Sequence, residues 1–407
     1  MKKHKKIDLL APAGNFEKLE IAIHYGADAV YLGGKNFSLR NFSGNFELDE
    51  MKRAVDFAHD HGAKVYVTCN VFPRNDDLDG ISDFLASLNE IKPDGVIIAD
   101  PGVFSMAREN APDIPIHISV QANNTSAESA RFWGKMGAVR INTARELSLA
   151  EISEIAAGTG IEIESFAHGA MCVSYSGRCL LSSFLSNRDA NQGKCSHPCR
   201  WKYSVMEHQR PGQYLPVAED DRGTYIFNSK DLCMIEHIPE MIHAGIDCLK
   251  IEGRMKGINY LASTVRVYRA AIDRYYDDPD RWEPDPRWKE ELSGISNRDY
   301  CAGFYFGDPS QTTLNRKQSK SDTDRIFIGK VLGPADHGMT SVEVRNKLLI
   351  NDAVEILAQQ GPVEQDVIKE IINENGERLD VAQHGARVTI LFEKTYAKND
   401  IIRKINS

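Results

Sequence analysis

Four cysteines lie close together in the middle of the chain. They fall in the stretch from Glu164 to Tyr203, ESFAHGAMCVSYSGRCLLSSFLSNRDANQGKCSHPCRWKY. They are Cys172, Cys179, Cys195 and Cys199, and a fifth, Cys233, follows at a distance. In a reducing compartment, clustered thiols more often serve metal or redox chemistry than disulfides. The stretch is therefore the first candidate for a functional site.

The spacing of these thiols is compatible with more than one metal centre. Structural zinc sites use pairs of closely spaced cysteines, and only Cys195 and Cys199 have that spacing. An iron–sulfur cluster tolerates irregular spacing, because its thiolates can converge from loops and a helix. Buried free thiols are the alternative without a metal. Cys69 and Cys248 fall at or within predicted strands and are interpreted as core residues.

The stretch that carries the cysteines is basic, whereas the whole chain is acidic. Its 407 residues have a net charge of −9, which argues against a surface built for indiscriminate nucleic-acid binding. From Arg178 to Arg210, six positive residues, Arg200 among them, stand against two negative ones, a local charge of +4. The segment is either a solvated loop or a site for phosphate or another anion.

Short apolar strands alternate with amphipathic helices on both sides of this stretch. The eight predicted strands are Ile7–Leu10, Ala29–Leu32, Val65–Thr68, Gly95–Ala99, Ile116–Val120, Ala138–Asn142, Ile161–Phe166 and Ile246–Ile251. Helices fit the gaps, for example one capped by Asn15 and ended before Gly26. Eight such units favour a closed (β/α)8 TIM-like barrel, with an open doubly wound sheet as the alternative.

Polar residues follow the predicted strands, at the end where a barrel of this kind carries its active site. The candidates for substrate binding there are Asn70, Gln121, Asn142, Lys250 and Arg254. Glu164, His168 and Glu252 come from the last two strands and are the candidates for proton transfer. An ion-pair network that closes the barrel is the structural alternative for these charged residues.

The cysteine-bearing stretch interrupts the barrel between its seventh and eighth strands. We predict a barrel over residues 1–278 with an insertion at 170–228, a connecting segment and linker over 279–324, and a small β-barrel domain over 325–407. A helix capped by Asn228 or Ser229 is predicted to follow the insertion. Cys233 would lie in its first turn, where the helix dipole favours a thiolate.

The sequence resembles the collagenase-like peptidases of family U-32 over nearly its whole length. The family motif Glu-x-Phe-x-x-Gly-[Ser/Ala]-[Leu/Met]-Cys-x4-Gly-x-Cys-x-[Leu/Met]-Ser is matched by Glu164, Phe166, Gly169, Ala170, Met171, Cys172, Gly177, Cys179, Leu181 and Ser182. Other similar stretches are LLAPAGNFEKLEIAIHYGADAVYLGG, NQGKCSHPCRWKY and LKIEGRMK. This combination is specific for the family and less specific for a reaction.

The resemblance implies an enzyme that modifies RNA. Some bacterial relatives look like oxygen-independent hydroxylation proteins that convert the wobble uridine of tRNA to 5-hydroxyuridine, with prephenate as hydroxyl donor. The small C-terminal domain is similar to that of this tRNA-modifying branch. The implied partners are therefore tRNA and prephenate or a similar small carboxylated donor, which Arg254 could hold in bidentate fashion. Arg178 and Arg200 would contact the RNA.

The resemblance also implies a cofactor. Several relatives carry a four-iron four-sulfur (4Fe-4S) cluster, whose cysteine pattern corresponds here to Cys172, Cys179, Cys195 and Cys233. Cys199 is the alternative fourth ligand. A non-catalytic iron–sulfur scaffold for another enzyme would have much the same sequence, and is kept as an alternative function.

A peptidase is the other alternative, as the family name suggests. The sequence contains no HExxH zinc motif and no GxSxG elbow. His168 and Cys172 could form a nucleophile–base pair, but that thiol would lie among metal-competent neighbours. We expect a cytoplasmic protein outside the membrane, since the basic start MKKHKK precedes an apolar strand shorter than a signal peptide requires.

Overall fold

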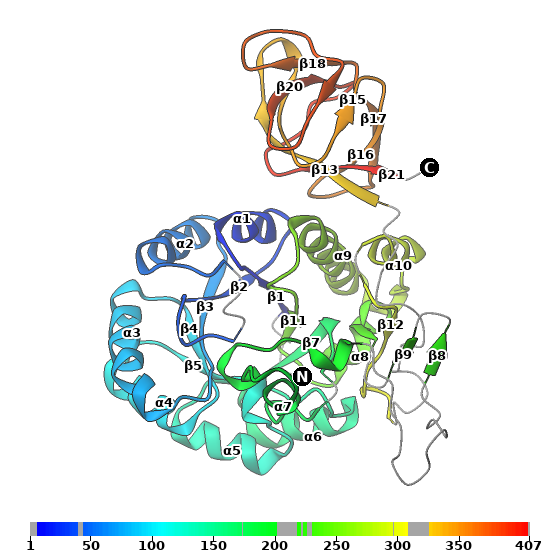
Figure 1. Cartoon of the computed structure of the whole chain (residues 1–407). Helices are drawn as coiled ribbons and strands as arrows, with labels where there is room; N and C mark the ends of the chain where they lie inside the picture. The colour runs from blue at the N-terminus through cyan, green and yellow to red at the C-terminus, as the bar shows by residue number, and fades with distance from the viewer. Residues whose placement is uncertain are drawn as a thin grey trace, which may run out of the picture.

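Eight parallel strands close into the predicted barrel (Figure 1). In this computed structural model, which describes residues 6–39, 44–172, 174–201, 218–220, 223–225, 230–295, 297–307 and 325–405, they are β1 (Asp8–Pro12), β2 (Ala29–Gly33), β3 (Lys64–Cys69), β4 (Gly95–Ile98), β5 (Ile116–Ile118), β6 (Arg140–Asn142), β7 (Glu162–Ala170) and β11 (Cys248–Ile251). Strand β11 pairs with both β7 and β1, which closes the ring. Each predicted strand overlaps an observed one, and the closed ring excludes the open sheet.

Helices surround the barrel on its outer side (Figure 1). They are α1 (Phe16–His24), α2 (Leu48–Asp60), α3 (Leu78–Ile91), α4 (Pro101–Asn110), α5 (Ala127–Met136), α6 (Leu149–Thr159), α8 (Ile238–His243) and α9 (Ile258–Asp277). The Asn15 side chain accepts a hydrogen bond from the N–H of Lys18, as predicted, so local capping sets the start of α1. The apolar helix faces pack on the strands and form the main core. Within the described ranges, no helix has the length and apolarity that crossing a membrane requires.

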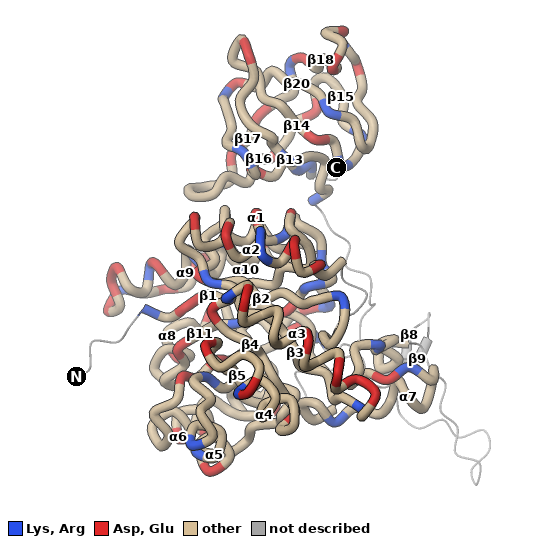
Figure 2. Tube along the Cα trace, turned by 90° about the vertical axis from the view of Figure 1, so that its left-hand side faces the viewer, with Lys and Arg blue, Asp and Glu red and all other residues tan. Residues whose placement is uncertain are grey.

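Strand β7 is longer than its neighbours and carries the insertion. Its last residues pair antiparallel with β10 (Asp231–Cys233), and β10 pairs with β12 (Tyr300–Cys301). The described part of the insertion contains α7 (Leu181–Ser186) and the hairpin of β8 (Ala218–Asp220) and β9 (Gly223–Tyr225). Figure 1 shows α7 inside the ring of helices, and Figure 2 shows it at one side of the barrel. Together the two views place α7 over one end of the barrel.

The prediction that Cys233 lies in the first turn of a helix is wrong. Residues Asp231–Cys233 form strand β10, and helix α8 begins only at Ile238. Two side chains explain why tertiary pairing overrides the local helical pattern: Leu232 is buried, and the buried Asp231 carboxylate pairs with Arg298. Cys233 therefore does not lie at a helix N-terminus. Burial raises the pKa of its thiol to about 11.

Parts of the predicted boundaries fall outside the described residues. These include the helix caps Asn228 and Ser229 and the polar linker at 312–324. The described part of the connecting segment is more than a linker, because it contains helix α10 (Pro286–Ser293) and strand β12, which extends the barrel sheet.

The C-terminal residues form the predicted separate β domain. Its antiparallel strands are β13 (Arg325–Pro334), β14 (Thr340–Val344), β16 (Ala353–Leu357), β17 (Glu364–Val367), β18 (Glu370–Asn373), β20 (Arg387–Leu391) and β21 (Ile401–Ile405). A further pair consists of β15 (Leu348–Leu349) and β19 (Val381–Ala382). The domain has its own apolar core. Strand β21, which pairs with β13 and β16, is not apparent from the sequence pattern.

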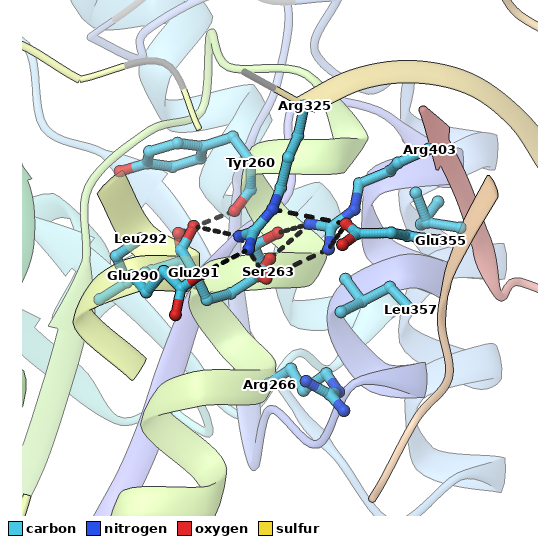
Figure 3. Close-up of polar contacts among 12 residues, drawn as sticks. Tyr260, Ser263, Arg266, Glu290, Glu291, Leu292, Arg325, Glu355, Leu357 and Arg403 are labelled. Carbon is cyan, nitrogen blue, oxygen red and sulfur yellow. Dashed lines mark hydrogen bonds and ion pairs between the residues drawn. The ribbon is translucent and has the colours of Figure 1, made fainter. Parts of the chain in front are cut away.

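A buried ion network joins the β domain to the barrel (Figure 3). Arg403 on β21 is fully buried and donates hydrogen bonds to Glu291 on α10, Glu355 on β16 and Ser263 on α9. Arg325 pairs with the same two carboxylates. Because Arg403 and Arg325 of the β domain both pair with Glu291 on the barrel side, this network favours one relative position of the two parts.

Tyr25 makes a second buried contact across the same junction. Its hydroxyl donates to the carbonyl of Leu357 at 2.5 Å and accepts from the N–H of Ile401 at 3.1 Å. Leu357 and Ile401 are also part of the core that fills the barrel layers. The domain is therefore packed against the barrel by apolar as well as polar groups.

Candidate active site

A pocket lies at the C-terminal ends of the barrel strands. It is partly open to solvent, and its empty volume including that open part is about 510 Å³. The lining residues are Tyr31, Leu39, Thr68, Asn70, Ser119, Val120, Gln121, Asn142, Arg145, Phe166, Lys250, Glu252 and Arg254. The structure thus brings together all five residues predicted for substrate binding at strand ends, with Glu252 beside them.

Glu164 lies one layer deeper than the pocket, two residues before the lining Phe166 on β7. Its carboxylate accepts hydrogen bonds from Lys250 Nζ at 2.7 Å and Asn142 Nδ2 at 2.8 Å. Arg140 Nη1 is 3.7 Å from the other carboxylate oxygen. Burial raises the pKa of Glu164, but Lys250 and Arg140 outweigh that effect and hold the pKa below its ordinary value. The ionised carboxylate therefore fixes the ammonium of Lys250 at the pocket.

Arg254 supports the pocket wall through three hydrogen bonds. Its guanidinium donates to Ser38 Oγ at 2.9 Å, to Thr68 Oγ1 at 3.1 Å and to the carbonyl oxygen of Leu39. Arg254 is 2% exposed, so much of its donor capacity serves the loop after β2. The observed contacts make it a positioning residue as well as a member of the pocket.

Arg145 is a pocket residue that sequence reasoning misses. Its guanidinium carbon is 4.0 Å from the centroid of the Phe166 ring, and Nη2 is 4.0 Å from Glu252 Oε2. Nη1 lies 3.4 Å from the sulfur of Cys172. Arg145 therefore links the pocket to the cysteine stretch. Arg145 lies three residues after the end of β6. The search for polar residues that follow a strand, which selects Asn142, could therefore have found it.

His168 is not among the residues that line the pocket. It lies on the extended part of β7, with its ring 5.2–5.8 Å from the rings of Tyr260, Tyr268 and Tyr300. Burial lowers the pKa of His168 to about 3, so the imidazole is neutral at physiological pH. Its Nε2 has no hydrogen-bond partner in the described parts of the chain. The three predicted proton-transfer residues thus do not form one constellation, and Glu252 is the one at the pocket.

The candidate metal ligands are distributed along the rim of the barrel. Cys172 is exposed just after β7, Cys179, Cys195 and Cys199 are partly exposed in the insertion, and Cys233 is on β10. Thiolate donors suit an iron–sulfur cluster. However, no three His, Cys, Asp or Glu side chains of the described residues are arranged to hold a metal ion. The thiols are therefore chemically suited to bind such a cluster, but the described side chains are not already arranged around a common metal site.

The insertion covers the pocket end of the barrel, and we name its residues 174–201 the cap. Ser176 Oγ donates to the Glu146 carboxylate at 2.8 Å. The N–H of Phe72, after β3, donates to the carbonyl of Asn191 at 3.0 Å. The loops after β3 and β6 are thereby tied to the insertion, which follows β7. The cap is held in contact with the rim from which the pocket residues come.

Arg178 and Arg200 belong to the cap and not to the pocket lining. Arg178 is exposed to solvent. The backbone of Arg200 ends a short 3-10 turn (Pro198–Arg200), and its side chain lies outside the described residues. The sequence-predicted binding residues thus fall into two groups, one around the pocket and one on the cap.

Replacing Gly177 by alanine is expected to displace the cap. Gly177 has φ +73°, and a Cβ there would lie 2.1 Å from the carbonyl oxygen of Gln121. Gly160 is a matched control, because it has φ +68° and no heavy atom lies within 4 Å of an added Cβ. Amide hydrogen exchange in the cap should accelerate in Gly177→Ala and not in Gly160→Ala. Unchanged exchange in both would show that the close approach does not hold the cap.

Comparison with known proteins identifies relatives of both parts of the chain. Peptidase family U32 matches residues 14–315, and the peptidase family U32 C-terminal domain matches residues 323–403. The chain is 41% identical to tRNA hydroxylation protein P1 of Bacillus subtilis (strain 168), over 97% of this chain and 94% of that protein. It is 37% identical to tRNA hydroxylation protein P of Escherichia coli (strain K12), over 93% and 91%. It is 30% identical to a protein named collagenase of Porphyromonas gingivalis (strain ATCC BAA-308 / W83), over 97% and 96%.

Proposed function

The chain belongs to peptidase family U32, and we propose that it is an enzyme that hydroxylates tRNA. The main support is that two tRNA hydroxylation proteins are 41% and 37% identical to this chain over more than nine tenths of its length, including the β domain. The protein named collagenase matches over a similar span at the lower identity of 30%. In finer detail, the proposed reaction is oxygen-independent conversion of the wobble uridine to 5-hydroxyuridine.

The pocket supports a small carboxylated hydroxyl donor, prephenate or a similar acid, as part of this proposal. Arg145, Lys250 and Arg254 all line it, and arginine is well suited to bind a carboxylate. Glu252 is the carboxylate at the pocket, hydrogen-bonded to the Tyr31 hydroxyl at 3.3 Å, and is our candidate for proton transfer.

We further propose that Cys172, Cys179, Cys195 and Cys233 hold a 4Fe-4S cluster, with Cys199 as the alternative fourth ligand. Support comes from the chemistry of the four thiols, which suit such a cluster, and from the ladder of β7 and β10, in which Cys233 faces His168, four residues before Cys172. When bound, the cluster would supply electron transfer. Iron and sulfide analysis after anaerobic purification tests this, and an iron-free protein under those conditions would refute it.

Deleting the gene should remove 5-hydroxyuridine-derived nucleosides from cellular tRNA, as measured by mass spectrometry of tRNA digests. The wild-type chain should restore them, and Glu252→Gln should restore them at a rate lower by about 10²-fold or more, because it removes the proton-transfer group at the pocket. Glu162→Gln is the matched control, since Glu162 is a half-exposed carboxylate that does not line the pocket. Unchanged tRNA with loss of a peptide-cleaving activity would favour the peptidase instead.

A further inference from the structure

Helix α7 on the cap turns its polar side inward and its apolar side outward. The hydroxyl of Ser196 is 3.1 Å from that of Ser182 and 2.6 Å from that of Ser186, and Ser182 is buried. Leu180 and Phe184, one helical turn apart, are 56% and 83% exposed. Surface helices of globular domains normally show the reverse pattern. Packing within the described residues therefore does not explain this apolar face.

The exposed apolar side chains of the cap include aromatic rings. Phe184 has the largest exposed fraction of the large hydrophobic side chains described, and Tyr175, also on the cap, is 69% exposed. The N–H of Arg178 donates to the carbonyl of Tyr175 at 3.1 Å, so this ring and a cationic side chain belong to one turn. Flat rings next to cations are the pattern that binds unpaired bases.

The charge of the cap complements a phosphate backbone. Arg178 and Lys194 are exposed, and Arg188 is partly exposed with its Nε bonded to the carbonyl of Lys194 at 3.0 Å. Asp189 is the acidic residue of residues 174–201, and it lies 3.7 Å from Arg74. The outer surface of the cap is therefore cationic where the rest of the chain is acidic. This charge favours a polyanionic ligand, and the exposed rings beside it favour RNA over an acidic protein surface.

We propose that the exposed face of the cap that carries Phe184 is a stacking platform for unpaired bases of an RNA loop. This rests on the proposed function and specifies how its substrate is held. A paired RNA helix offers its backbone and shallow groove, whereas a single-stranded loop can place bases on aromatic rings. Figures 1 and 2 place α7 over one end of the barrel, and the close approach of Gly177 to the lining residue Gln121 identifies it as the end that carries the pocket. A loop bound there would present its target base at the pocket rim.

Fluorescence anisotropy with the full-length protein tests the platform. One probe is an end-labelled RNA hairpin with an unpaired loop, and the other is a fully paired RNA duplex of the same length. Phe184→Ala should weaken hairpin binding by about tenfold and leave duplex binding unchanged. Phe132→Ala is the matched control, because Phe132 is 55% exposed on α5, on the outer side of the barrel.

Two further variants separate stacking from other contacts. Phe184→Trp keeps a flat ring and should retain wild-type affinity, whereas Phe184→Leu keeps apolar area without a ring and should bind like Phe184→Ala. Arg178→Gln should reduce the salt slope of hairpin binding by about 0.7, the value for one phosphate contact on a single strand. Wild-type affinity in Phe184→Leu would overturn base stacking, because it would show that hairpin binding does not require a flat ring at this position.

The inference and the proposed function fail in different ways. If the wild-type protein does not bind the hairpin, the platform is refuted, whereas the proposed function is refuted by unchanged tRNA nucleosides in the deletion strain. If it binds and Phe184→Ala binds equally well, only the platform is refuted. Loss of the tRNA nucleoside in the deletion strain, combined with unchanged hairpin affinity in Phe184→Ala, would uphold the function and reject the platform.

Discussion

Replacing Glu164 by glutamine is expected to lower the free energy of unfolding by about 3–5 kcal/mol, the cost of removing one partner from a buried ion pair. In the wild type, Lys250 and Arg140 both pair with the Glu164 carboxylate. The substitution would leave these two buried cations beside a neutral amide. It should also release Lys250 from its place at the pocket. Denaturant unfolding of the purified protein measures the first effect, and the tRNA assay measures the second.

Glu162→Gln is the control for this measurement. Glu162 also pairs with Arg140, at 2.7 Å, but its side chain is 40% exposed. Solvent screens such a pair, so we expect a loss of at most about 1 kcal/mol. Equal losses in the two variants would contradict the special role that burial gives to Glu164.

The pH dependence of unfolding gives an independent test of the same carboxylate. The pKa of Glu164 is lower in the folded protein than its ordinary value, about 4.3, in an unfolded chain. A depressed folded pKa stabilises the fold above the unfolded pKa, and that stabilisation is lost as pH falls through the folded value. The stability difference between the wild type and Glu164→Gln should therefore be constant at neutral pH and shrink in acid.

Replacing Arg403 by methionine is expected to loosen the β domain from the barrel, with a loss of about 3–5 kcal/mol. Arg403 is fully buried between Glu291 and Glu355, which come from opposite sides of the junction (Figure 3). Without the guanidinium of Arg403, Glu291 and Glu355 would share the single cation of Arg325 as their remaining described ion-pair partner. Small-angle X-ray scattering should show a larger maximum dimension, and denaturant unfolding should shift to a lower midpoint.

Lys398→Met is the matched control at the same junction. Lys398 pairs with Glu20 at 3.2 Å, but its side chain is 61% exposed, so the expected loss is at most about 1 kcal/mol. A double-mutant cycle of Arg403→Met with Glu291→Gln isolates the coupling between the two buried groups. Additive losses together with an unchanged scattering curve would show that the network does not fix the domain.

Most of the barrel can be predicted from the sequence because its signals are local. Each strand is a short apolar run, and each helix has an apolar face with a cap such as Asn15. The pocket follows from topology, since the C-terminal ends of parallel strands meet at one rim. That rule alone brings Asn70, Gln121 and Lys250 to a common pocket.

The remaining features depend on contacts between residues far apart in the sequence. Cys233 has a helical neighbourhood, yet the ladder to β7 makes it part of a strand. His168 follows a predicted strand, as the pocket residues do, but β7 continues to Ala170 and carries His168 past the pocket. Strand β21 includes the charged Arg403, which suggests a surface segment until its partner Glu291 is known. None of these outcomes is encoded in a local window.

The closure of the barrel by β1 and β11 also sets an order of events on the ribosome. The two strands are joined by residues about 240 positions apart. At about 5–20 residues per second, β1 must wait about 10–50 s for its second partner, with one edge unpaired. The candidate thiols up to Cys233 emerge before that moment, and Arg403 emerges last. A nascent chain therefore exposes its candidate thiols first, closes its barrel second and gains the Arg403 contact of its β domain last.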